Sequence, residues 1–129
     1  MNDENQVLVN SAVASTAFPN SMPNAQMEVV KKAQNWFESK IKVPCTGCKY
    51  CVPCPKHVDI PGIFEKFNNA SMRGLFENTE KIFLEDYKKL VDWNRGANQC
   101  IKGGACLQKC PQHIDIPGKL QEAHNSLLM

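Results

Sequence analysis

The cysteines of this chain fall in two short runs, and these runs limit what it can fold into more than any other feature of the sequence. The chain has 129 residues and seven cysteines. CTGCKYCVPCP holds Cys45, Cys48, Cys51 and Cys54, and CIKGGACLQKCP holds Cys100, Cys106 and Cys110. An odd number of thiols in two clusters is not typical of a disulfide framework or of scattered core cysteines. The runs therefore predict a site for metal binding or redox chemistry.

The two runs belong to an internal repeat. CPKHVDIPG, residues 54–62, recurs as CPQHIDIPG, residues 110–118, with seven of nine positions identical and an offset of 56 residues. Upstream of these segments the offset is 55, and it pairs Cys48 of the first run with Gly103 of the second. The remaining pairs at this offset are Cys45 with Cys100 and Cys51 with Cys106. The second half is therefore one cysteine short of the first.

The cysteine spacing is typical of iron-sulfur sites. Three thiolates at C-x2-C-x2-C reach three iron corners of one cubane, and in two-cluster ferredoxins the cysteine before proline binds the cluster of the other run. Applied to this chain, the pattern assigns cluster I to Cys45, Cys48, Cys51 and Cys110. It assigns cluster II to Cys54, Cys100 and Cys106, with no ligand at Gly103. The first run ends in C-x2-C-P instead of the usual C-x3-C-P, so the position of Cys54 departs from the pattern.

The glycine at position 103 leaves the state of cluster II open. A cubane held by three thiolates readily loses the iron at its unprotected corner and becomes a [3Fe-4S] cluster. It can also keep that iron with water or a substrate in the open place, or the whole cluster can be absent. We expect cluster II to be the more labile of the two and to differ from cluster I in reduction potential. A Lewis-acid enzyme site would also need acid and base groups, and the sequence shows no convergent set of them.

Two alternatives involve the same segments. Zinc also binds four cysteines with paired C-x2-C spacing, so a non-redox structural or interaction module folded around zinc is the alternative function. Three cysteines at intervals of three, closed by Cys-Pro, favour iron-sulfur. His57 and His113 stand at equivalent positions of the repeat and could each replace the missing ligand. Because both halves carry this histidine, we favour a role in the turn before a helix.

Apolar periodicity predicts helices on both sides of the first run. One helix is expected from Met27 to Ile41, with Met27, Val30, Ala33, Phe37 and Ile41 on one face. Others are expected at 63–67, at 79–93 and from Lys119 to about Leu128. The anchors of the helix at 79–93 would be Ile82, Phe83, Leu90 and Trp93. No alternation of polar and apolar residues marks a strand.

These elements predict an all-α fold rather than the small βαβ type of ferredoxin. We expect an N-terminal helical segment over residues 1–42 and a helical cluster-binding domain with two pseudo-symmetric cysteine motifs over residues 43–129. The aromatic residues are expected in the core, and Tyr50, inside the first cysteine run, is the best placed to shield a cluster. The other members of this set are Trp36, Phe64, Phe67, Tyr87 and Trp93.

One family carries a similar pattern. VPCTGCKYCVPCPKHVDIPGIFEKFN, a helical spacer, and a cysteine run ending in CPQHIDIPGKL together resemble the C-terminal iron-sulfur domain of a group of prokaryotic aldo/keto reductases. The resemblance covers residues 43–68 and 98–120, with fainter similarity over the N-terminal helices. It implies an α-helical ferredoxin-like domain with two [4Fe-4S] clusters that passes electrons to or from a nicotinamide-dependent reductase barrel. This family reads CIxCGxC where the chain reads CIKGGAC, so Ile101 and Gly104 match and Gly103 does not.

The remaining features bear on partners. The reductase barrel and its catalytic residues are absent, so we expect no catalytic residue in the chain and no enzyme activity of its own. Fifteen basic and 13 acidic residues give a net charge of +2, which favours neither nucleic acid nor an anionic membrane as a partner. The start MNDENQVLVN is unlike a signal peptide, and no apolar run approaches a membrane span. We expect a cytoplasmic electron carrier with one or two iron-sulfur clusters, partnered by a reductase barrel or another redox protein.

Overall fold

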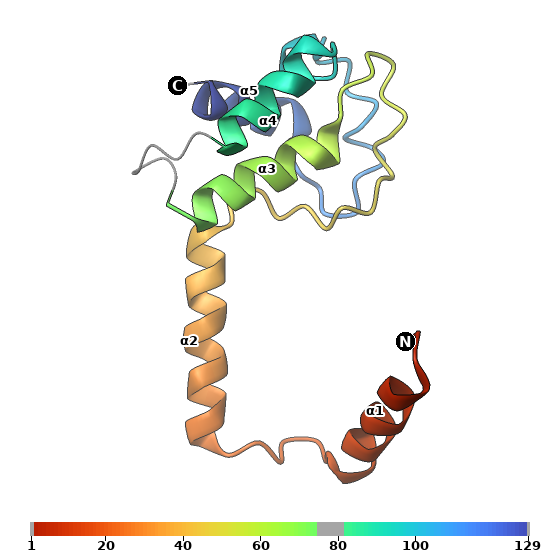
Figure 1. Ribbon diagram of the computed structural model, residues 1–129, viewed down its shortest axis with the longest axis vertical. Helices are drawn as coiled ribbons and strands as arrows, with labels where there is room; N and C mark the ends of the chain where they lie inside the picture. Colours follow the sequence, from red (N-terminus) through yellow and green to blue (C-terminus); the bar gives the residue numbers. More distant parts are fainter. Residues whose placement is uncertain (1, 75–81, 129) are drawn as a thin grey trace. The chain divides into compact units, whose positions relative to one another are not determined.

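The computed structural model describes residues 2–74 and 82–128 and shows helices joined by loops (Figure 1). The helices are α1 (Glu4–Thr16), α2 (Asn24–Lys40), α3 (Ile60–Met72), α4 (Ile82–Asp92), the short 3-10 helix η1 (Ala97–Gln99) and α5 (Ile116–Leu127). The described residues contain no β-strand, which confirms the predicted all-α fold class. None of the helices in these residues is long and apolar enough to cross a membrane.

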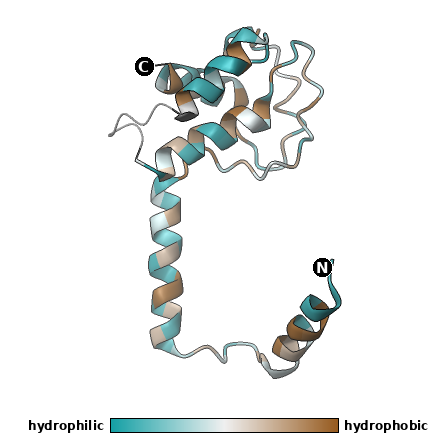
Figure 2. Ribbon diagram, in the orientation of Figure 1, coloured by the Kyte–Doolittle hydropathy of each residue, from teal (hydrophilic) through white to brown (hydrophobic). Residues whose placement is uncertain are grey.

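The chain divides into two compact units, Met1–Trp36 and Phe37–Met129. The first unit contains α1, whose N-cap Asp3 accepts a hydrogen bond from the backbone N–H of Asn5 at 2.7 Å. Neither α1 nor α2 has a buried residue, and Figure 2 shows hydrophilic and hydrophobic residues interleaved along α2. The division at Trp36 falls inside α2. The domain boundary predicted after residue 42 lies further along the chain and stays a prediction.

The second unit is built around one apolar core. Helix α3 packs against both α4 and α5, and α5 also packs against η1. In Figure 1 the two cysteine runs form the loops beside these helices, and they reach the core through the starts of α3 and α5. The buried apolar residues are Val43, Val58, Ile60, Ile63, Phe64, Phe67, Ala70, Tyr87, Leu90, Ala97, Ile114, Ile116, Leu120, Ala123 and Leu127. The core therefore contains residues from both halves of the repeat.

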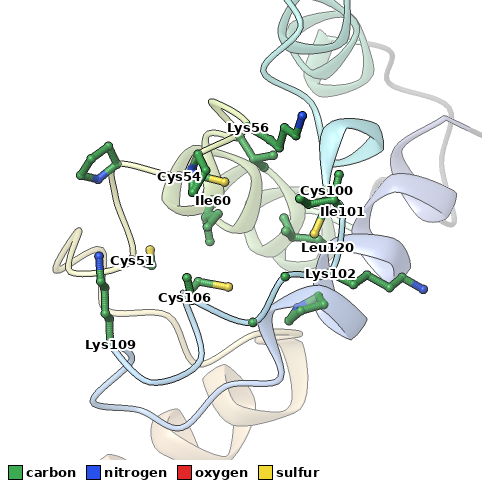
Figure 3. Close-up of a pocket in the computed structure, with 17 residues that line it drawn as sticks. Cys51, Cys54, Lys56, Ile60, Cys100, Ile101, Lys102, Cys106, Lys109 and Leu120 are labelled. Carbon is green, nitrogen blue, oxygen red and sulfur yellow. The ribbon is translucent and has the colours of Figure 1, made fainter.

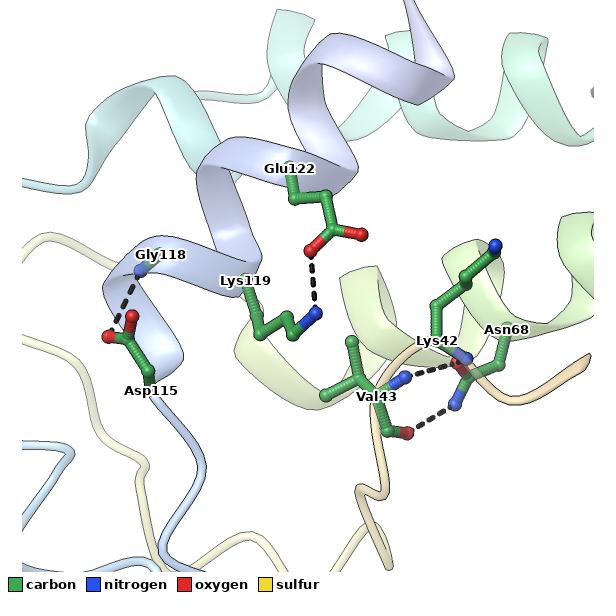
Figure 4. A network of polar contacts seen from close by, with 7 residues as sticks. All are labelled: Lys42, Val43, Asn68, Asp115, Gly118, Lys119 and Glu122. Atoms are coloured by element: carbon green, nitrogen blue, oxygen red, sulfur yellow. Dashed lines mark hydrogen bonds and ion pairs between the residues drawn. The ribbon is translucent and has the colours of Figure 1, made fainter. Parts of the chain in front are cut away.

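Both halves of the repeat begin a helix in the same way. Asp59 is the N-cap of α3, and its Oδ1 accepts a hydrogen bond from the N–H of Gly62 at 3.2 Å. Asp115 is the N-cap of α5 and bonds Gly118 at the same distance (Figure 4). In each helix a proline stands between the capping aspartate and this glycine. It lies in the first turn, where its missing N–H removes no hydrogen bond of the helix. The sequence DIPG therefore sets the point at which each cysteine loop becomes helical.

The helices differ from the predicted ones mainly at their ends. Helix α2 begins three residues before the predicted Met27, after Pro23, whose carbonyl accepts two backbone hydrogen bonds. Helices α3 and α5 begin at Ile60 and Ile116, because the aspartate caps precede the prolines. Helix α3 also continues past the predicted end at residue 67, since burial of Ala70 and Ser71 outweighs the low helix propensity of the asparagines before them. Helix α4 confirms the helix predicted at 79–93, of which residues 79–81 lie outside the described residues.

The predicted positions of several apolar side chains are corrected. Leu90 is buried as expected, but Trp93 follows the end of α4 and is 64% exposed. The side chains of Ile82 and Phe83 lie outside the described residues. Among the other aromatic residues Phe64, Phe67 and Tyr87 are buried, whereas Trp36 is 50% and Tyr50 64% exposed. Trp36, Tyr50 and Trp93 are therefore not core residues.

The side chain of Asn68 fixes the segment that leads into the first cysteine run. Its Oδ1 accepts hydrogen bonds from the backbone N–H groups of Lys42 at 3.0 Å and Val43 at 2.9 Å. Its Nδ2 donates to the carbonyl of Val43 at 2.7 Å (Figure 4). Val43 is fully buried and belongs to no helix, so this amide satisfies backbone groups that would otherwise be buried without partners. Asn68 thereby holds the backbone two residues before Cys45.

We predict that Asn68→Ala lowers the free energy of unfolding by about 2 kcal/mol, because it leaves partly buried backbone groups of Val43 unpaired. The measurement is chemical denaturation of the metal-loaded protein. Asn69→Ala, on the same helix, is the matched control and is expected to change stability by under about 0.5 kcal/mol. Equal effects of the two variants would contradict the role given to Asn68.

The hydroxyl of Tyr87 connects α4, η1 and α5. It accepts a hydrogen bond from the N–H of Ala97 at 3.2 Å and lies 2.6 Å from Nδ1 of His124. With Ala97 as donor, the phenolic proton is free to be donated to His124. Burial raises the pKa of Tyr87 above its ordinary value of 10.0, and the hydrogen bond from Ala97 opposes this rise. The fold therefore favours the neutral phenol.

The raised pKa of Tyr87 predicts a loss of stability at alkaline pH. A folded pKa above the unfolded one stabilises the protein fully below the unfolded value, and this contribution is lost as pH rises through the folded pKa. We expect the unfolding free energy of the native protein to fall more steeply above about pH 10 than that of Tyr87→Phe. Denaturation at a series of pH values measures this. Tyr50→Phe, which removes an exposed phenol, should behave like the native protein.

Candidate metal centre

The two cysteine runs form loops that have part of their backbone conformation in common. Each loop has left-handed residues at two corresponding places, with φ of 69° at Gly47 and 56° at Lys102, and 65° at Lys49 and 77° at Gly104. Each loop thus places glycine at one of these positions and lysine at the other. A left-handed lysine carries a cost that glycine avoids, so the shape of the loop is maintained against the preference of one residue in each half.

The turns after the last cysteine of each run also match. His57 and His113 have φ of 58° and 52°, and their backbone N–H groups donate to the carbonyls of Cys54 at 2.8 Å and Cys110 at 3.1 Å. Both side chains are exposed. Neither histidine is among the residues that line the cavity of Cys54, described below. Their arrangement is that of turn residues, as we favoured from the repeat.

Four cysteines line one cavity, which we call the first cavity. They are Cys45, Cys48, Cys51 and Cys110, the set predicted for cluster I. Much of the remaining wall is apolar and comes from Ile60, Phe64, Ile114 and Ile116. The space open to the centres of water-sized molecules is about 20 Å³. The first cavity is therefore small, shielded by the helical core, and provided with thiols from both halves of the repeat.

The other three cysteines line a second cavity. Cys54, Cys100 and Cys106 are the set predicted for cluster II, and Figure 3 shows their sulfur atoms around a common space. Gly103 also lines this space, which holds about 170 Å³ for the centres of water-sized molecules. Cys51 lines both cavities, so the two share part of a wall. The site that lacks a cysteine is thus the roomier one.

Nothing in the backbone requires glycine at position 103. Its φ lies outside the left-handed region, unlike that of its neighbour Gly104. A Cβ at Gly103 would meet only Ile101, whose Cδ1 and Cγ1 lie 3.9 Å away, which is ordinary van der Waals contact. The residue is also exposed to solvent. The second loop therefore has room at position 103 for a side chain larger than that of glycine.

Two of the thiols, one assigned to each cluster, have raised pKa values. Burial raises the pKa of Cys51, and the nearby Cys45, Cys48 and Cys106 add to the rise. Burial likewise raises the pKa of Cys106, with contributions from Cys100 and Cys54. Crowded, partly buried thiols resist forming several thiolates at once. Metal binding reverses this, because the ligands must be deprotonated and a cation compensates their charge.

The loops around these thiols are basic. Residues 44–58 and 100–114 contain four lysines and no aspartate or glutamate. Of these, Lys56, Lys102 and Lys109 line the second cavity, and Lys49 lines the first. Positive charge of this kind favours thiolates and any anionic group bound between them.

The arrangement fits a polynuclear cluster. The cysteines line two cavities, and a cubane takes one thiolate at each of its iron corners. Cys45, Cys48, Cys51 and Cys110 would hold one such cluster. Cys54, Cys100 and Cys106 would hold three corners of another.

Comparison with known proteins supports this chemistry. The model of the 4Fe-4S dicluster domain matches residues 44–114, a range that includes all seven cysteines. The comparisons with curated proteins and with solved structures give no significant match.

The geometry at position 103 leads to a prediction for iron binding. We expect Gly103→Cys to retain more iron after transfer into thiol-free buffer with a chelator, by about one iron per chain or more, since the added thiolate holds the fourth corner of a cubane. Iron and acid-labile sulfide analysis measures the difference. Gly103→Ala adds the Cβ without a thiol and is the matched control. If both variants retain as much iron as the native protein, the missing ligand at Gly103 does not limit cluster binding.

Proposed function

The chain belongs to the 4Fe-4S dicluster domain family, and from this premise we propose that it transfers electrons through two iron-sulfur clusters. Cluster I is held by Cys45, Cys48, Cys51 and Cys110, and cluster II by Cys54, Cys100 and Cys106. One observation carries this assignment: each cavity is lined by cysteines from both halves of the repeat. This is the crossed pattern of two-cluster ferredoxins, in which the cysteine before proline serves the other cluster.

The protein's own residues create the conditions for electron transfer. The thiolates hold the clusters, which supply the one-electron chemistry when bound. Ile60 and Phe64 exclude water from the first cavity, and burial is one of the factors that set the potential of a bound cluster. Cys51 belongs to both cavities, so the route from one cluster to the other passes a single shared wall. Lysines beside the thiolates offset their negative charge.

The wider role that we propose is that of a ferredoxin-like domain for an aldo/keto reductase-like oxidoreductase. The support is the resemblance of residues 43–68 and 98–120 to the iron-sulfur domain of that family. In this arrangement the substrate and nicotinamide chemistry belongs to a reductase barrel or another redox partner, and this chain carries electrons without being an enzyme on its own.

Anaerobic isolation of the full chain tests the proposal. We expect about seven or eight irons per chain, the content of one complete cubane and a second with or without its fourth iron, and reversible one-electron reduction followed by electron paramagnetic resonance. A colourless protein that contains zinc and no sulfide would instead support the structural module and overturn electron transfer.

Paired cysteine variants test the crossed assignment. We expect Cys110→Ser to alter the same resonance signal as Cys48→Ser, although these residues stand in different halves of the repeat. Cys54→Ser should alter the same signal as Cys106→Ser. If the variants instead pair within each run, so that Cys54→Ser matches Cys48→Ser, each half would hold its own cluster and the assignment would be wrong.

A further inference from the structure

We propose that the gap at Gly103 is a binding site for a small anionic thiol from solution, which supplies the fourth ligand of cluster II. This inference rests on the proposed function, because it requires a cluster in the second cavity. It goes further by giving the site a ligand class that the chain itself does not provide.

The first argument is that the chain places no donor of its own in the gap. Among the described residues only Ile101 has atoms within 4 Å of the position that a Cβ of Gly103 would occupy, and these are carbon atoms. The side chains of His57 and His113 are exposed, and neither residue lines this cavity. Cys51 also lines this cavity but is assigned to cluster I, so the chain leaves the fourth corner of cluster II without a thiolate of its own.

The second argument is access. Gly103 and Ile101 are exposed, so the gap opens to solvent rather than to the helical core. The second cavity has about 170 Å³ for the centres of water-sized molecules, against about 20 Å³ in the first, where Cys48 occupies the equivalent place. A small molecule can therefore reach the second site, and it finds more room there than in the first.

The donor type follows from the repeat. The position equivalent to Gly103 is Cys48, and both are flanked by left-handed residues, so this part of the loop is one that carries a thiol in the first run. Iron in a sulfur cluster takes thiolate ligands. On binding, the thiol releases its proton to the buffer and its sulfur donates a lone pair to iron in place of water. No electron is transferred in this step.

The preferred charge follows from the rim of the cavity. Lys56, Lys102 and Lys109 line it, and no acidic residue does. Figure 3 shows their side chains at the edge of the cavity, and the ammonium of Lys102 donates to Oε1 of Gln121 at 3.0 Å. Lysines in this arrangement attract a negative charge on the part of the ligand that points to solvent. A thiol with a carboxylate tail therefore fits better than one with an ammonium tail.

A series of three thiols tests the proposal on the full chain, loaded with clusters under anaerobic conditions. The probes are 3-mercaptopropionate, 2-mercaptoethanol and cysteamine, which present similar thiols with negative, neutral and positive tails. We expect each to change the electron paramagnetic resonance spectrum of one cluster only, with apparent affinity falling in that order. Gly103→Cys should abolish the change, because its own thiolate takes the position.

The role of the lysines at the edge of the second cavity is tested by the double variant Lys56→Gln, Lys109→Gln. This variant should weaken binding of 3-mercaptopropionate on the order of threefold, as expected for the loss of two solvent-screened charges, and leave 2-mercaptoethanol nearly unchanged. Lys88→Gln, on an exposed position of α4 away from both cavities, is the matched control and should change neither affinity.

The possible outcomes separate this inference from the proposed function. Two reversible clusters with no spectral response to any thiol, or an equal response in Gly103→Cys, would overturn the thiol site and leave electron transfer intact. A protein with about four irons, one cubane, would overturn the thiol site in the same way. Absence of any iron-sulfur cluster would overturn both.

Discussion

Both metal cavities depend on one shared wall, to which Cys51 and Ile60 contribute. Ile60 is buried at the first turn of α3, so this wall is at the same time part of the helical core. Full burial of an aliphatic side chain of this size stabilises a fold by about 1.5–3 kcal/mol, and here the same side chain separates the two sites. The thiols are also crowded, and a bound metal relieves that crowding. Core packing and metal binding therefore stabilise each other across the same residue.

The two halves of the site differ in their ligands far more than in their backbone. Left-handed residues recur at Gly47 and Lys102 and again at Lys49 and Gly104, although the residue types are exchanged. The aspartate caps then turn both loops into helices through the same hydrogen bond. Pseudo-symmetry is thus imposed by the turns and caps, and the contrast between a small cavity and a larger one arises at the side-chain level.

The sequence predicted the features that depend on short-range chemistry. The DIPG segments predicted helices close to where α3 and α5 begin, whereas the assignment of each cysteine to a cluster from its spacing stays a prediction. Features that depend on long-range packing were not predictable in this way. The exposure of Trp93 depends on where α4 ends, and the role of Asn68 depends on a segment 25 residues away. Neither leaves a periodic signal, since a polar residue on a helix is ordinarily read as part of its solvent face.

Because there is room around Gly103, the side chain at position 103 can be changed without changing the fold. Its φ is ordinary and a new Cβ meets only ordinary contacts, so oxygen, nitrogen or sulfur donors of different softness could be installed there on one unchanged backbone. The equivalent Cys48 lines the smaller cavity in the same molecule, which provides an internal reference against which the effect of each donor could be compared.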